Sequence, residues 1–384
     1  MDPQLFDDLQ QSLAKEGPAK AIDHLCTMLR ERKDYTNLFY ALLMKKRFEM
    51  GVSPVPAGAS QDLPAELHTP YEDAIREACR LVGQLYLDEG DIPHAWVFYR
   101  MLGEHEPMVK AIEKFQPQEG EDCQQVVEIA YHHGVQPRKG FDLILERYGI
   151  CSAITMLGGG EFQHGVEVRD YCVQRLVRAL YQELKDRLVA EITRTQGFEP
   201  TGKTVHELIE GRDWLFGEDY FHVDISHLSS VVQMASNLSP CPELELAREL
   251  CAYGQRLSTR FQYNTDPPFE DQYKDYGIFL GIIAGDQVEE GLAHFRAKVE
   301  NADPETVGTY PAEVFVNLLL RLNRPAEALD IARRYLANVD ENRLSCPNLV
   351  DLCQRTKDYA ALAEIARQQG NPVHFMAGLI AARN

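Results

Sequence analysis

The chain has 384 residues, of which 45% are hydrophobic and 26% are charged, a composition that is typical of a globular protein and excludes an intrinsically disordered one. This length is enough for two or three domains or for one extended array of repeats. The formal net charge of −20 would repel nucleic-acid backbones and anionic membrane surfaces, so we expect neither as a partner, and a basic or neutral protein or peptide fits the charge better.

Residues 1–50 are expected to form a helical hairpin followed by one further helix. Apolar residues recur three or four positions apart in Leu5–Leu13 and again in Ala21–Leu29. The third helix is predicted at about Tyr35–Met50. The segment 51–70 is rich in Pro, Ala, Gly and Ser, and we interpret it as a linker at a domain boundary.

The clearest repeat signal lies in the predicted unit 71–149. Gly83 and Ala95 are small enough for two helices to cross closely, and Tyr86 and Tyr99 can fill the space between neighbouring hairpins. The residues that carry this pattern are Cys79, Val82, Gly83, Tyr86, Ala95, Tyr99, Leu102 and Pro107.

This pattern resembles the tetratricopeptide repeat family. It departs from the family at Cys79, where tryptophan is usual, and at Leu102, where alanine is usual. Pro107 is expected to close the second helix of the pair. The resemblance implies antiparallel helical hairpins stacked as a solenoid, with a concave face that holds a segment of a partner protein.

Residues 150–273 do not follow the repeat period and are predicted to form an irregular central helical segment. It includes a long amphipathic helix at about Val166–Thr193. An irregular segment between regular repeats is the place where a solenoid most often carries a site, so we look for the site there.

The repeat pattern returns in residues 274–384. The pair Ala328-Leu329 recurs 33 positions later as Ala361-Leu362, which is close to the length of one tetratricopeptide unit. The predicted fold class is therefore all-α, with antiparallel helical hairpins stacked as a tetratricopeptide-like solenoid around an irregular central segment.

Two imidazoles and a carboxylate lie within six residues in the central segment, at His222, Asp224 and His227. If a helix begins near Asp224, then Asp224 and His227 share one of its faces and could bind a divalent metal together with His222. The alternative is structural: Asp224 or Ser226 caps the predicted helix Leu228–Leu238, and the histidines are hydrogen-bonded or exposed.

Three further residues could complete such a metal site. Glu161 and His164 are three positions apart, the spacing with which helical bundles present a carboxylate and an imidazole to one metal, and His133 lies at the end of another predicted helix. This ligand set suits zinc, iron or manganese and could activate a water molecule. The corresponding function is a metal-dependent hydrolase or lyase acting on a small polar substrate, which is the alternative to an interaction module.

Residues 197–204 match the phosphate-binding loop pattern, two glycines separated by four residues and followed by Lys203-Thr204. That loop needs a buried β-strand before it, whereas residues 180–195 have the pattern of an amphipathic helix. We therefore favour a helix C-cap at Gly197 and an ordinary loop over a nucleotide site.

Aromatic residues concentrate at the end of the central segment, where they could form either core or the wall of a ligand or peptide groove. They are Tyr253, Phe261, Tyr263, Phe269, Tyr273 and Tyr276.

A cytoplasmic location is expected. The first residues are acidic and lack the apolar core of a signal peptide, and the longest apolar run, Tyr276–Gly285, is shorter than the roughly 20 residues of a membrane helix. The nine cysteines are scattered and include no C-x-x-C pair, which suits buried thiols in a reducing compartment. The oligomeric state stays open.

Overall fold

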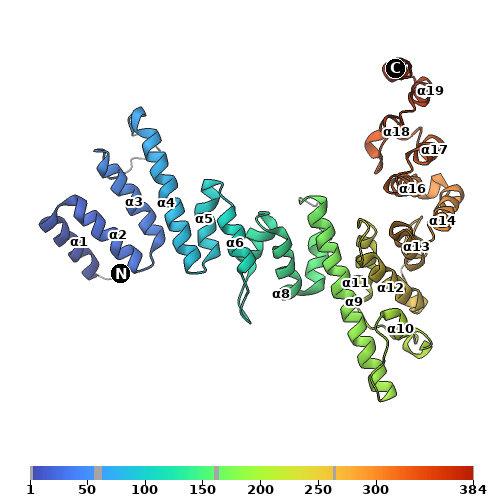
Figure 1. Ribbon diagram of the computed structural model, residues 1–384, viewed down its shortest axis with the longest axis horizontal. Helices are drawn as coiled ribbons and strands as arrows, with labels where there is room; N and C mark the ends of the chain where they lie inside the picture. Colours follow the sequence, from blue (N-terminus) through green and yellow to red (C-terminus); the bar gives the residue numbers. More distant parts are fainter. Residues whose placement is uncertain (1–2, 56–62, 160–163, 263–264, 384) are drawn as a thin grey trace. The chain divides into compact units, whose positions relative to one another are not determined.

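The computed structural model describes residues 3–55, 63–159, 164–262 and 265–383. These residues form α-helices joined by turns, with no β-strand among them, so the prediction of an all-α protein is confirmed. The chain divides into two compact units, residues 1–148 (unit 1) and 149–384 (unit 2). Figure 1 colours unit 1 from blue to green and unit 2 from green to red.

In unit 1 the helices from α1 to α6 pack side by side, each against the next along the chain, and α7 packs against α5. Its helices are α1 (Pro3–Glu16), α2 (Pro18–Glu31), α3 (Tyr35–Glu49), α4 (His68–Asp88), α5 (Ile92–Leu102), α6 (Glu106–Lys114), α7 (Gln124–Val127) and the first part of α8 (Pro137–Gly158). Proline at the start of α2, α5 and α6 suits the first helical turn, where the missing N–H has no helical partner. A π-helical turn, Glu128–His132, continues α7.

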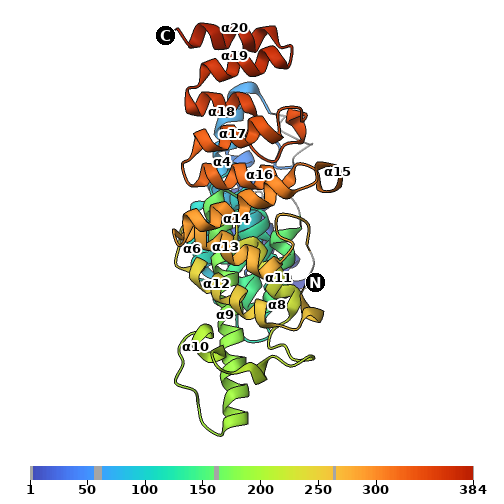
Figure 2. The same ribbon diagram turned by 90° about the vertical axis from the view of Figure 1, so that its right-hand side faces the viewer.

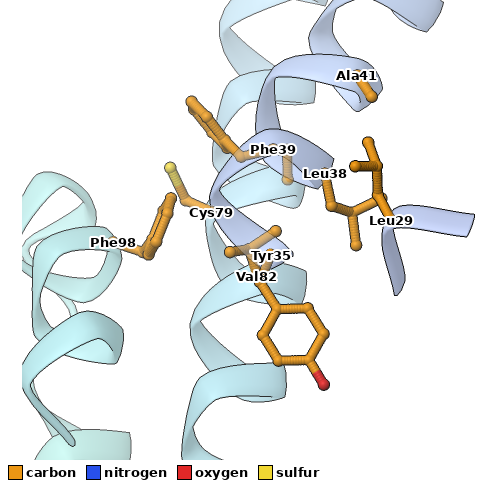
Figure 3. Close-up of a cluster of buried hydrophobic side chains, with 9 residues drawn as sticks. Leu29, Tyr35, Leu38, Phe39, Ala41, Cys79, Val82 and Phe98 are labelled. Atoms are coloured by element: carbon orange, nitrogen blue, oxygen red, sulfur yellow. The ribbon is translucent and has the colours of Figure 1, made fainter. Parts of the chain in front are cut away.

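The core of unit 1 includes a cluster of side chains from α2 to α5 (Figure 3). The rings of Phe39 and Phe98 meet edge to face with their centroids 5.4 Å apart, and the thiol of Cys79 is buried beside Phe98. On α4, a Cβ atom at Gly83 would lie 2.9 Å from the Tyr99 ring of α5. Glycine at position 83 therefore allows α4 and α5 to cross closely, as the sequence predicts.

The prediction for Pro107 is wrong. Helix α5 ends at Leu102, and Gly103 follows it in the left-handed conformation (φ 69°) as the C-cap. Pro107 instead lies in the first turn of α6. The physical reason is that proline fits a helix start as well as the region beyond a helix end, whereas a left-handed C-cap favours glycine.

Unit 2 begins inside α8, whose helical dihedral angles break at Gly149 (φ 82°). The helices that follow are α9 (Val166–Gln196), α10 (Val205–Ile209), α11 (Ile225–Ala235), α12 (Glu243–Arg256), α13 (Gln272–Ala284), α14 (Val288–Asn301), α15 (Pro304–Val307), α16 (Tyr310–Arg321), α17 (Pro325–Tyr335), α18 (Leu349–Thr356), α19 (Tyr359–Gln368) and α20 (Pro372–Ala381). Short 3₁₀ turns occur in both units at Ala65–Leu67, Asp213–Leu215, Thr259–Phe261 and Glu341–Arg343.

The long helix α9 organises the first half of unit 2. It was predicted at about Val166–Thr193, and the structure extends it to Gln196. Its fully buried residues, including Leu180 and Leu184, face α10, α11 and α12. From α13 to α20 the helices stack one after another, with the short α15 to one side of the stack, as Figure 2 shows. No helix in the described ranges combines the length and the apolar character needed to cross a membrane.

Candidate functional site

The imidazole of His222 is buried against Tyr253 of α12. The backbone N–H of His222 donates a hydrogen bond to Tyr253 Oη (2.8 Å), and the ring Nδ1 lies 3.0 Å from the same oxygen. Burial lowers the pKa of His222, the Glu191 carboxylate opposes that shift, and the Arg187 guanidinium adds to it. The imidazole is therefore neutral at pH 7 and hydrogen-bonded to the buried hydroxyl of Tyr253.

We expect His222 to make the protein less stable as the pH falls below about 6.5. Its pKa is lower in the folded chain than the ordinary value of 6.5, so the unfolded chain binds the proton first. The stabilisation that the neutral imidazole contributes is therefore fully present above about pH 6.5, and it is lost as the pH falls through the lower pKa that His222 has in the folded chain. In urea unfolding between about pH 7 and pH 5, His222→Gln should show a shallower loss of unfolding free energy than the wild type.

The matched control is His24→Gln, which removes an exposed histidine of α2. It should keep the wild-type slope. Equal slopes for His222→Gln and the wild type would show that protonation of this imidazole is not coupled to unfolding.

Asp224 is the N-cap of α11. Its carboxylate accepts hydrogen bonds from the backbone N–H groups of Ser226 (2.8 Å) and His227 (3.2 Å), and from the Ser226 hydroxyl. The hydroxyl bond is the main cause that lowers the pKa of Asp224, and the two backbone bonds contribute in the same direction. The capping alternative therefore describes Asp224, while His227 is half-buried on the first turn of α11.

The remaining metal candidates are distributed over the chain. His164 is half-buried just before α9, His133 is exposed in unit 1 with its ring 5.7 Å from that of Trp96, and Glu161 lies outside the described residues. Within the described ranges, no three His, Cys, Asp or Glu side chains are close enough together to hold one metal ion. The metal site that includes Glu161 stays a prediction.

The segment that matches the phosphate-binding loop joins two helices. Gly197 is in the left-handed conformation (φ 79°) and caps the C-terminus of α9, which confirms the predicted C-cap. Thr204 caps the N-terminus of α10 in a reciprocal pair with Glu207, whose carboxylate also accepts the backbone N–H of Lys203 (2.6 Å). These backbone bonds lower the pKa of Glu207. The Glu207 carboxylate thus takes the backbone N–H groups of Lys203 and Thr204, which a bound phosphate would need as donors.

A groove of about 780 Å³ opens between α10, α12, α13 and α14, and we name it the acidic groove. Small residues line it on three helices: Ala252 on α12, Gly277 and Gly281 on α13, and Gly291 on α14. Gly291 lets α13 and α14 pack closely beside the groove, because a Cβ there would lie 2.5 Å from Ile282 Cγ1.

Five carboxylates line the acidic groove against two fixed cations, Arg248 and Lys274. They are Glu207, Glu245, Glu249, Asp286 and Glu290. Arg248 is already paired, with Nη1 2.8 Å from Glu245 and Nη2 2.7 Å from Asp286. The Glu290 carboxylate forms no hydrogen bond or ion pair with a described residue. The groove therefore has an excess of negative charge.

One carboxylate of the acidic groove also connects three helices. Glu249 of α12 accepts hydrogen bonds from the Tyr181 hydroxyl of α9 (2.9 Å) and from the backbone N–H of His206 in α10 (3.0 Å). Burial raises the pKa of Tyr181, and the bond to Glu249 adds to that rise, to about 12. This network holds α10 against the groove.

Sequence reasoning missed most of the acidic groove because it did not identify α12. The signal was present: Leu244, Ala247, Leu250 and Cys251 recur at helical spacing and are buried.

Comparison of the chain with protein-family models, with curated proteins and with solved structures finds no match. Its function is therefore inferred from its own residues.

Proposed function

We propose that the protein is an interaction module of tetratricopeptide-like helical hairpins, and that unit 2 binds a basic segment of a partner protein in the acidic groove. The excess of carboxylates among the residues that line the acidic groove is the observation that carries this proposal. A lysine- or arginine-rich segment would replace the missing positive charge, and complementary charge both steers and orients a partner.

Helix packing supports the repeat arrangement. Helices α13 and α14, α16 and α17, and α19 and α20 are consecutive pairs in contact, joined by short turns. Helix α14 contacts α16, and α18 packs between α17 and α19. Short connections of this kind join antiparallel neighbours. Glycine permits the close approach again in the last pair, since a Cβ at Gly378 would lie 2.8 Å from the Ala363 nitrogen.

The size of the acidic groove fits a short peptide segment. Binding pockets of about 300–1,000 Å³ take a compact ligand or the side chains of a few residues. The unpaired carboxylate of Glu290 is available to a lysine or arginine side chain, and the exposed carboxylate of Glu245 has one oxygen that does not contact its partner Arg248. Salt should weaken the complex, because exposed charges are screened over about 10 Å at 0.1 M.

The test uses a fluorescent peptide that alternates lysine and alanine over about ten residues, which extends to about 33 Å at about 3.3 Å per residue. The wild type should bind it and should not bind the same peptide with glutamate in place of lysine. The double variant Glu245→Gln/Glu290→Gln should weaken binding about five-fold or more, because each exposed charge pair contributes up to about 1 kcal/mol. Fluorescence anisotropy measures the affinity.

The control variant Glu218→Gln/Glu300→Gln removes the same charge from exposed positions outside the groove. It should bind like the wild type. Equal weakening by both double variants would mean that only net charge matters, and the proposed groove would be wrong. Equal binding of the basic and acidic peptides would contradict the proposal as well.

A further inference from the structure

A second cavity of unit 2, about 710 Å³ in volume, lies among α9, α11, α13, α16 and α18. It shares no lining residue with the acidic groove. We name it the arginine cavity, because its charged lining residues are Arg169, Arg321 and Arg355. Its aromatic wall consists of Phe269, Tyr276, Phe279 and Tyr310. No carboxylate is among the described residues that line it, which is unusual in a chain with a net charge of −20.

Helix α13 separates the two sites. Gly277 and Gly281, four positions apart, lie on the stripe that faces the acidic groove. Tyr276 and Phe279, three positions apart, lie on a second stripe that faces the arginine cavity. With 3.6 residues per turn, one helix can therefore present small residues to one site and aromatic rings to the other.

Arg321 of α16 is held by neutral groups. Its two terminal nitrogens donate hydrogen bonds to the carbonyl oxygens of Ser236 and Leu238, which follow the end of α11. Its guanidinium carbon lies 5.9 Å from the centre of the Phe279 ring. A guanidinium has five N–H donors, so these two bonds leave donors for a further acceptor. The contacts fix the position of the charge without neutralising it.

Arg169 and Arg355 form no ion pair with any described residue, and the buried Nε of Arg169 has no hydrogen-bond partner among them. Partial burial lowers the pKa of Arg321, the neighbouring Asp170 opposes that shift, and Arg169 adds to it. One oxygen of the Asp170 carboxylate accepts a hydrogen bond from the Ser239 hydroxyl (2.9 Å), and the other is buried without a hydrogen-bond partner among the described residues. Positive charges thus converge in the cavity with incomplete compensation.

Hydrogen bonds hold the rim, and ring stacking holds part of the aromatic wall. Glu313 of α16 accepts two hydrogen bonds from Ser345, through its backbone N–H (2.8 Å) and its hydroxyl (2.6 Å), and this holds the loop before α18 at the rim. Phe269 and Tyr276 stack with ring centres 4.1 Å apart and planes at 7°. Tyr310 is 47% exposed and so offers an aromatic surface to a ligand.

We propose that the arginine cavity binds a small organic anion with a planar, apolar body. Its carboxylate or phosphate group pairs with the three arginines, since guanidinium groups match the geometry of both. Its planar body lies against the aromatic wall. The volume suits a small ligand, because such pockets span about 300–1,000 Å³. This site goes beyond the proposed peptide-binding function, and neither depends on the other.

The test is isothermal titration calorimetry of the full chain with 1-naphthyl phosphate, which carries both features. Saturable binding to one site is expected, about ten-fold or more tighter than the binding of 1-naphthol or of inorganic phosphate, because each of these has only one of the two features. Equal affinity for either comparator, or the absence of binding, would overturn the proposal.

The variant Arg169→Gln/Arg355→Gln should lose about ten-fold or more of the affinity for 1-naphthyl phosphate. Its matched control, Arg343→Gln/Arg367→Gln, removes two exposed arginines of unit 2 that do not line the cavity and should bind like the wild type. Arg355→Gln alone, at an exposed position on α18, serves if the double variant does not fold.

If the control and the cavity variants lost affinity for 1-naphthyl phosphate equally, the arginine cavity would not be the binding site. The groove variant Glu245→Gln/Glu290→Gln should bind 1-naphthyl phosphate as the wild type does. That comparison separates failure of this inference from failure of the proposed peptide binding.

Discussion

Asp275→Ala is expected to lower the unfolding free energy of unit 2 by about 3 kcal/mol or more, because it leaves a largely buried cation without its main partner. The Asp275 side chain is 1% exposed. One of its oxygens lies 2.8 Å from Lys298 Nζ and accepts the backbone N–H of Asp271 (2.9 Å), and the other lies 2.8 Å from His294 Nε2. The carboxylate thus joins α13 to α14.

The substitution would leave the largely buried charge of Lys298 with fewer partners. Its side chain is only 16% exposed. Burial alone would lower the pKa of Lys298, but hydrogen bonds to Asp275 and Glu270 outweigh burial and raise it. Without Asp275, this ammonium group keeps its desolvation and loses one of its two carboxylate partners.

Urea unfolding of the full chain, followed by circular dichroism, measures the loss. The control Glu364→Ala breaks an ion pair of the same length, 2.8 Å, but an exposed one with Arg333, and it should cost no more than about 1 kcal/mol. The double variant Asp275→Leu/Lys298→Met should be more stable than Asp275→Ala, since it removes both charges together. A loss for Asp275→Ala no larger than that of the control would refute the buried-pair explanation.

Gly254→Ala is expected to lower the unfolding free energy by about 2 kcal/mol, because α12 and α13 have no room for a methyl group there. A Cβ at Gly254 would lie 2.5 Å from both Cγ and Cδ1 of Tyr273. The Tyr273 ring is 1% exposed and therefore cannot move aside into solvent. The gain in helix propensity from glycine to alanine, about 1 kcal/mol, offsets only part of the loss.

Gly277→Ala is the matched control on the facing helix. A Cβ there would lie 3.4 Å from the Cys251 Cβ, an ordinary contact, so helix propensity should leave stability unchanged or slightly raised. Thermal unfolding measures both variants. A Gly254→Ala protein as stable as Gly277→Ala would mean that α12 and α13 can separate without cost.

Local sequence determined the helices of this protein. The apolar spacing of α9 predicted its length to within a few residues, and Gly197 and Asp224 are caps because the groups that they satisfy lie within one turn. Pro107 was misassigned for the same local reason, since it suits either side of a helix boundary, and Gly103 marks the end of α5. The spacing of apolar residues and the capping residues did not lead to a prediction of α6, α12 or α20.

Tertiary packing decided the sites. His222 and His227 are five positions apart, yet one turns into the core because Tyr253, 31 residues on, meets it there, and the other lies on α11. The arginine cavity collects side chains from Arg169 to Arg355, and the acidic groove spans four helices. Helical periodicity follows from bonds between residues three or four apart, whereas a cavity depends on which helix faces meet, and that is set by packing between residues far apart in the chain.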